Sequence, residues 1–459
     1  MYRLLTVLLV AGVVLGAALP SSALKLMSPT PNQTVRESVK ISIPVADLPP
    51  EFVIPQGEVV PDKERPFITV SVGSGGSDRL VAAVSPDAGT VKNGAITFYW
   101  DSKAPYRDPQ DPRNDRFLKD GRYTLTVQVY KLGKMSDSAS VDIQLKNKLD
   151  RSNPAPGVRL VNRLVFGESH TYAAHAEVQV FHVVAGTGLP ILGGMGMTSD
   201  FKIIQSVEDK RPEGTYLLRC RMDPEGFISS FGQKLRLFAS DQPTPQLYRL
   251  VDKFGNVLTR NVFSRQGKYT IMDVLPVLDQ RPVREADTWP TAFDLKIEGI
   301  TRVIPLAGDS QLDSFEWQNG HECAKIISTL KGPGAISMDN GRIRSSSTQV
   351  DALVVTYFAY KTGKMLRREI TLEFPAVIMP GAGQIEGAGS SGATTTPGVT
   401  RPPVYAPEPG LEGDMAAPGI LVPPGGPYSG PSSSAGTQTG EPMAKKGSVQ
   451  IKVVVRLEK

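Results

Sequence analysis

The segment Ser448-Val449-Gln450-Ile451-Lys452-Val453-Val454-Val455-Arg456-Leu457 carries the clearest strand pattern in the 459-residue chain. Its large apolar residues stand at every second position, which is the period of a strand with one buried face. These residues are Val449, Ile451, Val453, Val455 and Leu457. Burying each is worth about 1.5–3 kcal/mol, whereas closing a loop of about 70 residues instead of 5 costs only about 2–2.5 kcal/mol more. We therefore expect residues 447–459 to dock antiparallel on Leu366–Phe374 or on another sheet edge.

The preceding segment, 380–446, is built from Gly, Pro, Ser, Thr and Ala with few bulky residues. Such a composition cannot bury enough surface to offset its ordering entropy, so we expect a disordered tether. A long tether also lets the strand enter a neighbouring molecule, as donated strands do. Docking within the chain is the favoured interpretation because it has the higher effective concentration, and self-association through this strand is the alternative.

Residues 24–147 alternate between short strand patterns and clusters of turn residues. One apolar face is formed by Val39, Ile41, Ile43 and Val45, and others by Ile96, Phe98 and Trp100, by Tyr123, Leu125, Val127 and Val129, and by Val141, Ile143 and Leu145. Period-two patterns with one apolar face indicate sheets with a single buried side, as in a β-sandwich. The stretch 101–115 is rich in Asp, Pro and Arg, and we expect a loop there.

Four motifs in this region carry a family resemblance. They are Ser28-Pro29-Thr30-Pro31, Trp100-Asp101, the segment 120–127 that begins Asp120-Gly121-Arg122-Tyr123, and the segment 141–147. Together they resemble a bacterial immunoglobulin-like domain without an inter-sheet cysteine pair. The resemblance implies a tyrosine corner, in which the Tyr123 phenol bonds back to the backbone. It also implies a spacer, adhesion module or docking platform, and no chemistry.

Residues 148–157 contain Asn153-Pro154-Ala155-Pro156-Gly157 and predict a stiff linker. Beyond it, residues 158–379 again read as strands, with hairpin turns at 252–256 and 360–364. The segment Pro282–Trp289 is similar to one in uncharacterised secreted bacterial β-domains, which are distantly similar to periplasmic lipoprotein carriers. The expected fold is all-β: an immunoglobulin-like β-sandwich, then a larger antiparallel β-domain (a curved sheet or half-barrel) that the C-terminal strand completes.

Residues 1–23 predict a cleavable signal peptide, with Arg3, a 16-residue apolar run and then Pro20 and small residues. An uncleaved anchor is the alternative. We expect a secreted or periplasmic protein of the cell envelope, with no transmembrane span after cleavage. The net charge is +5 and both signs are interspersed, which argues against nucleic acid as a partner because phosphate binding needs clustered Lys and Arg.

Export would expose Cys220 and Cys323 to an oxidising compartment. A disulfide between them would close a loop of about 100 residues, worth about 4–5 kcal/mol in the chain-entropy model. The disulfide is the favoured interpretation, and two buried free thiols are the alternative.

The segment 185–197 is apolar yet rich in glycine. Its large residues, Leu189, Ile191, Leu192, Met195 and Met197, either tuck against the core or form a flexible apolar lip over a groove. We expect Trp289 to lie in the core.

Catalytic patterns are weak throughout. The spacing of His170, His175 and His182 does not suit a metal site on one strand, and no zincin, phosphate-loop or nucleophile-elbow motif is present. We therefore expect no catalytic residue, metal or cofactor. The predicted function is a non-catalytic binding or structural protein that presents its second domain to an envelope protein or polymer. A carrier of an apolar ligand such as a lipid is the first alternative, and an envelope-polymer hydrolase is the second.

Overall fold

The computed structural model describes residues 24–48, 52, 66–74, 77–84, 91–104, 106–107, 115–132, 134–150, 157–183, 190–192, 197–230, 233–236, 246–260, 275–295, 304–333, 336–338, 343–379 and 445–458. Within these ranges the chain forms strands, turns and one short 3-10 helix, η1 (Val45–Asp47), so the expected all-β class is confirmed. No helix in these ranges is both long and apolar enough to span a lipid bilayer. The expected signal peptide and the expected tether up to residue 444 lie outside them.

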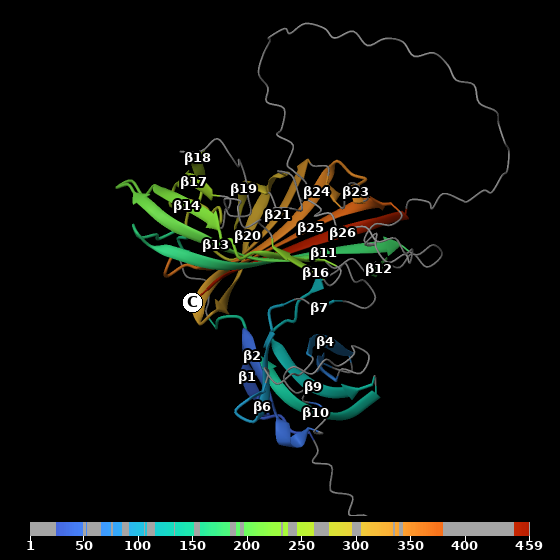
Figure 1. The fold of residues 1–459 in the computed structure, drawn as a ribbon. Helices are drawn as coiled ribbons and strands as arrows, with labels where there is room; N and C mark the ends of the chain where they lie inside the picture. The colour runs from blue at the N-terminus through green and yellow to red at the C-terminus, as the bar shows by residue number, and fades with distance from the viewer. Residues whose placement is uncertain are drawn as a thin grey trace, which may run out of the picture. The chain divides into compact units, whose positions relative to one another are not determined.

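Two sheets formed by residues 33–145 enclose one core and make a β-sandwich (Figure 1). The first sheet has the order β1-β10-β9-β3-β4, and the second has the order β2-β6-β5. The bounds are β1 (Gln33–Val35), β2 (Ser38–Pro44), β3 (Phe67–Ser74), β4 (Ser77–Val84), β5 (Val91–Lys92), β6 (Ala95–Asp101), β9 (Gly121–Lys131) and β10 (Lys134–Leu145). A separate short pair joins β7 (Tyr106–Arg107) and β8 (Asp115–Arg116).

The alternation of apolar residues in the sequence explains these strands. In β9, Leu125, Val127 and Val129 are fully buried, while the residues between them face outward. Trp100 on β6 is buried in the same core. The Tyr123 hydroxyl donates a 2.8 Å hydrogen bond to the carbonyl oxygen of Lys119, which confirms the expected bond from the phenol back to the backbone. The resemblance to the immunoglobulin-like family itself stays a prediction.

A larger antiparallel sheet contains the remaining long strands, in the order β18-β17-β14-β13-β11-β26-β25-β24-β21-β20-β19. Its first half consists of β11 (Ser169–Val183), β13 (Met197–Lys210), β14 (Tyr216–Met222), β17 (Gln246–Val251) and β18 (Val257–Arg260). Its second half consists of β19 (Thr288–Leu295), β20 (Ile304–Gln318), β21 (His321–Pro333), β24 (Gln349–Ala359) and β25 (Lys364–Ile378). Short strands add to it: β12 (Pro190–Leu192), β15 (Phe227–Ser230), β16 (Gln233–Arg236), β22 (Ser337–Met338) and β23 (Ile343–Ser345). The predicted turns at 252–256 and 360–364 join β17 to β18 and β24 to β25.

The strand β26 (Lys445–Leu457) lies between the two halves, seen in red between green β11 and orange β25 in Figure 1. It pairs antiparallel with β11 from His182↔Gly447 to Tyr172↔Leu457. It pairs antiparallel with β25 from Ile378↔Lys445 to Arg367↔Arg456. Val449, Ile451 and Val453 are fully buried, and Val455 is 2% exposed. The expected docking on Leu366–Phe374 is confirmed, but β26 occupies the middle of the sheet and not an edge.

The connection between β25 and β26 is unusual. Ile378 and Lys445 are directly paired, so a turn of a few residues could join the two strands, yet 66 residues (379–444) separate them. Replacing a 4-residue turn by such a connection costs about 2.5 kcal/mol of loop-closure entropy. The buried apolar face of β26 outweighs that cost.

The main core lies on one face of the larger sheet and draws buried residues from both halves and from β26. Trp289, on β19, is 3% exposed and belongs to this core, as expected. Its indole nitrogen donates to the carbonyl oxygen of Val277 at 3.2 Å. A second, smaller apolar cluster consists of Cys323, Val355, Tyr357, Ala359 and Leu366.

Candidate functional site

The segment that leads from the sandwich to the larger sheet is bonded to β20 from its first residues. The backbone nitrogen of Trp317, on β20, donates to the carbonyl oxygen of Asn147 at 2.9 Å. The backbone nitrogen of Leu149 donates to the carbonyl oxygen of Phe315, also at 2.9 Å. Lys148 therefore forms an isolated antiparallel bridge with Glu316 of β20 directly after β10, and the first two residues of the expected linker are part of this contact.

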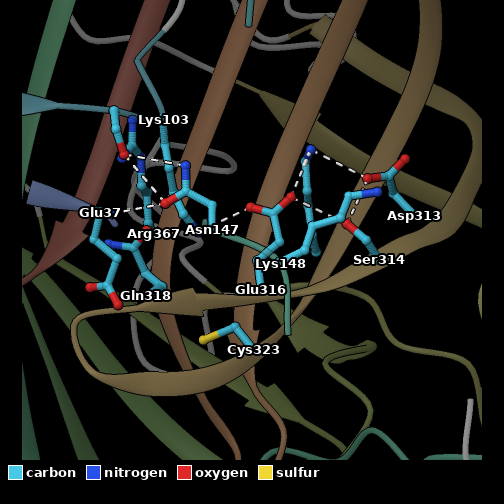
Figure 2. A network of polar contacts seen from close by, with 12 residues as sticks. Glu37, Lys103, Asn147, Lys148, Asp313, Ser314, Glu316, Gln318, Cys323 and Arg367 are labelled. Atoms are coloured by element: carbon cyan, nitrogen blue, oxygen red, sulfur yellow. Dashed lines mark hydrogen bonds and ion pairs between the residues drawn. The ribbon is translucent and has the colours of Figure 1, made fainter. Parts of the chain in front are cut away.

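Asn147 holds this crossing in place. The residue is 5% exposed, and its Oδ1 accepts hydrogen bonds from the Glu37 backbone nitrogen at 2.8 Å and from Ser102 Oγ at 3.3 Å (Figure 2). The Asp120 carboxylate accepts from the backbone nitrogens of Asn147 and Lys148, at 2.8 and 2.9 Å. Asp120 thus satisfies two successive N–H groups at the point where the chain changes sheets.

A tight turn of the larger sheet reaches the sandwich. Asn319 and Gly320, with φ of 50° and 74°, form the two-residue turn between β20 and β21. Such Asn-Gly turns need positive φ at both positions. The Gly320 nitrogen donates to the Glu37 carboxylate at 3.2 Å, and the guanidinium of Arg36 lies 4.2 Å from the ring centroid of Trp317.

Lys103 and Glu316 form the buried ion pair at the centre of the contact (Figure 2). Lys103 Nζ, from the sandwich, lies 3.1 Å from Glu316 Oε2 on β20, and these side chains are 2% and 7% exposed. The same ammonium lies 4.1 Å from the ring centroid of Tyr357, a cation–π arrangement. Lys325 Nζ approaches the other Glu316 oxygen at 3.3 Å. Lys103 belongs to the stretch expected to be a loop outside the core, and that expectation is wrong at this residue.

The electrostatics of the pair follow from burial and neighbours. Burial lowers the pKa of Lys103, although Glu316 acts in the opposite direction. The pKa of Glu316 is lowered because Lys103 and Lys325 together outweigh the opposing effect of its burial. Burial raises the pKa of the Cys323 thiol to about 12. Glu316 is therefore ionised and Cys323 is a neutral thiol at neutral pH.

A second set of ion pairs links the sandwich to the two central strands. Asp101, at the end of β6, accepts 2.7 Å hydrogen bonds on its Oδ2 from Arg367 of β25 and from Arg456 of β26. Arg367, whose side chain is 3% exposed, also pairs with Glu369. The sandwich, β25 and β26 thus meet at one carboxylate oxygen.

Beside these contacts lies a cleft of about 1050 Å³ lined by both the sandwich and the larger sheet. Its basic lining residues are Arg79, Lys103, Lys119, Lys148 and Lys325, and its acidic ones are Asp120, Asp313 and Glu316. Three aromatic rings, Phe117, Tyr123 and Tyr357, complete the apolar part of the wall. Glu316 and Asp313 pair with Lys103 and Lys325, and the five basic side chains outnumber the three acidic ones, so the lining carries an excess of positive charge. We call this space the interdomain cleft.

The favoured disulfide between Cys220 and Cys323 is wrong. Both cysteines are buried free thiols. Cys220 lies on β14 and Cys323 on β21, with β13, β11, β26, β25 and β24 between them. They also belong to different apolar clusters, whereas a disulfide requires Cα atoms within about 7 Å.

The expected apolar lip is described only in part. Leu189 and Met195 lie outside the described residues, and Ile191 and Leu192 are described as backbone of β12, paired with β11. Met197 begins β13 and packs, partly buried, against the main core. The contact of Met197 agrees with the tucked alternative, and the lip itself stays a prediction.

Histidines do not assemble a metal site among the residues that the structure describes, where no group of three or more His, Cys, Asp or Glu side chains could hold an ion. His170 is nearly buried, 3.2 Å from Glu168, and burial lowers its pKa. His175 is half-exposed and bonds to Asp200 at 2.7 Å.

Sequence reasoning missed most of the interdomain residues. Lys103, Asp120 and Asn147 are single polar residues near strand ends, without a spacing that marks a site. The turn at Asn319-Gly320 was a detectable signal, because Asn-Gly between apolar strands strongly predicts a hairpin. No protein-family model and no curated protein matches this sequence.

Proposed function

We propose that this chain is a non-catalytic binding protein of the cell envelope, and that it holds an anionic envelope polymer in the interdomain cleft. The observation that carries the proposal is the cleft itself, which has the volume of a ligand site and an excess of basic side chains in its lining. We infer export to the cell envelope from the predicted signal peptide, and this location is part of the proposal.

Preorganised walls support binding at this place. The Lys103–Glu316 pair, the crossing at Asn147 and the Asp101–Arg367 bond fix the two walls against each other. A ligand that enters a preformed cleft loses less free energy to ordering of the protein than one that must bring two parts together. Lys119 and Lys148 are exposed on the lining, where they can meet a carboxylate or phosphate.

The protonation states of Glu316, which lines the cleft, and of Cys323, which does not, argue against a role for either residue in hydrolysis. A glycosidase of the usual kind needs one carboxylic acid that is protonated near neutral pH, but the two lysines hold the pKa of Glu316 below its ordinary value. A cysteine nucleophile needs a thiolate, but the pKa of Cys323 is raised to about 12. Both groups instead suit a structural role under a binding surface.

The apolar-ligand carrier is the weaker alternative. A carrier requires a continuous apolar cavity of several hundred cubic ångströms. The apolar side chains on the inner face of the larger sheet pack against one another across β11, β13, β21, β24, β25 and β26, and most are less than 5% exposed. Such a filled core favours a platform.

Cosedimentation with purified peptidoglycan sacculi, whose peptide stems carry carboxylates, tests the proposal. The variant Lys119→Glu/Lys148→Glu reverses two charges on the cleft lining and should reduce the bound fraction at least fivefold. The variant Lys25→Glu/Lys40→Glu makes the same change in net charge outside this lining and should bind like the unmodified chain. If the two variants bind equally, the ligand does not bind in the cleft. If the unmodified chain does not bind the sacculi, peptidoglycan is not its ligand.

A further inference from the structure

We propose that the slot between β11 and β25 is a strand-acceptor site, and that β26 of a second copy of this chain occupies it in the assembled protein. Occupation of this slot does not depend on a ligand in the interdomain cleft.

Recognition of β26 uses groups that lie within the strand itself. Its backbone pairs with β11 on one side and with β25 on the other along nearly its whole length. Four alternate side chains, Val449, Ile451, Val453 and Val455, fill the core between the two halves. This is the chemistry of strand addition, in which the main chain supplies affinity and alternate side chains supply specificity. An identical strand from another molecule makes the same contacts.

The connection favours exchange. Ile378 and Lys445 are paired neighbours, so a short turn would hold β26 in its own slot. The actual 66 residues between them span up to roughly 200 Å when extended, at about 3.3 Å per residue. The effective concentration of a tethered strand falls steeply with linker length once the linker exceeds the required span. Docking within one chain therefore has only a weak advantage over docking between two chains at high local concentration.

Contacts near both ends of the slot select the sequence of the strand that occupies it. At Gly447 an added Cβ would collide with the carbonyl oxygen of Phe181 and would lie 2.7 Å from Ile378 Cδ1, so glycine is required there. At the other end, Arg456 bonds to Asp101 at 2.7 Å and Glu458 lies 3.1 Å from Lys202. These contacts define one register and make the site selective for the sequence of β26.

An empty slot would leave two long strand edges, on β11 and β25, with unpaired N–H and C=O groups. Such edges pair readily with other chains. A molecule that has given its β26 to a neighbour therefore accepts a β26 in return, and the exchange closes in a reciprocal pair.

The test uses two full-length chains, each with one new cysteine. His175 and Val454 face each other in the β11–β26 register, and the His175 side chain is half-exposed. A His175→Cys chain and a Val454→Cys chain, mixed at high concentration under mild oxidation, should give a disulfide-linked heterodimer. The native Cys220 and Cys323 stay buried. A chain with both substitutions reports docking within one molecule.

A matched donor separates insertion from random collision. The Val454→Cys/Gly447→Val chain has the same reactive thiol but a side chain that the slot cannot accept, so its heterodimer yield should fall at least tenfold. If the doubly substituted chain forms its internal disulfide while the mixed chains give no heterodimer, docking is confined to one molecule and the proposal fails. If neither sample forms a disulfide, the register itself is wrong. Native mass spectrometry of the unmodified chain should show the dimer, and a monomer at every concentration would count against exchange.

Discussion

Arg456 and Asp101 are 355 residues apart in sequence, and their side chains are joined by a 2.7 Å hydrogen bond. The same Asp101 oxygen accepts from Arg367, also at 2.7 Å. A single carboxylate from the sandwich thus ties together the last strand of the larger sheet and its neighbour. The docking of β26 therefore supplies one of the bonds that attach the sandwich to the larger sheet.

Removing the Asp101 charge should destabilise the fold. In Asp101→Asn the buried Arg367 keeps Glu369 but loses its second anionic partner. Hydrogen bonds to charged groups are worth about 1.5–3 kcal/mol, and we expect a loss of that size in urea unfolding. Asp150→Asn removes a well-exposed partner of Lys146 and should change nothing measurable. Equal effects of the two substitutions would contradict a structural role for Asp101.

The Lys103–Glu316 pair should give stability a specific pH dependence. Glu316→Gln leaves Lys103 buried without its counter-charge and should cost about 3 kcal/mol at neutral pH. The folded-state pKa of Glu316 lies below the ordinary value of 4.5. Its contribution is therefore complete above pH 4.5 and is lost as the pH falls through the folded-state pKa.

Urea unfolding of the unmodified chain and of Glu316→Gln, measured across pH 3–8, checks this. The difference between them should shrink in acid. Glu208→Gln, which removes the one-third-exposed partner of Arg219, should have a smaller effect. A difference that stays constant down to pH 3 would show that Glu316 acts through packing and not through its charge.

Shortening the connection before β26 should stabilise the chain. A four-residue turn in place of residues 379–444 removes about 2.5 kcal/mol of loop-closure entropy, because Ile378 and Lys445 are already paired. The midpoint of urea unfolding should rise accordingly. Replacing the segment by a Gly/Ser sequence of equal length should leave the midpoint unchanged. A lower midpoint in the shortened chain would mean that the segment contributes contacts of its own.

Both thiols should resist modification in the folded protein. Cys220 and Cys323 are 2% and 0% exposed, and the thiolate of Cys323 is scarce at pH 8 because its pKa is about 12. A thiol reagent at pH 8 should react slowly with the native chain. In denaturant it should react readily with two thiols per chain. His321→Cys, at the exposed first residue of β21, should react rapidly without denaturant. A melting temperature that falls when reductant is added would show that the chain does contain a disulfide, and would contradict the two free thiols.

Strands could be predicted from the sequence where the alternation of apolar residues was enough to identify them. Alternation alone identified β26 as a docked strand, because a strand with one apolar face must bury that face on a sheet; Leu366–Phe374, part of β25, was one of the edges proposed for it. It could not predict that β11 pairs with the other edge of β26, since periodicity carries no information about the identity of a partner. The central position of β26 emerged only from the three-dimensional arrangement.

The interdomain residues were hard to predict for a related reason. Lys103 lies in a stretch whose composition indicates a solvated loop, and its burial depends on Glu316, more than 200 positions away. The disulfide prediction failed because compartment and cysteine count say nothing about separation, and five strands stand between the two cysteines. Contacts between distant polar residues leave no local trace in a sequence.

The order of strands in the larger sheet also bears on how the protein is made. A ribosome has completed both halves of the sheet, and then 66 further residues, before it synthesises the strand that joins them. Until that moment the nascent polypeptide can form the sandwich but not the continuous sheet. A product that ends before Lys445 would lack β26 and leave the facing edges of β11 and β25 unpaired, and we expect proteases to degrade it.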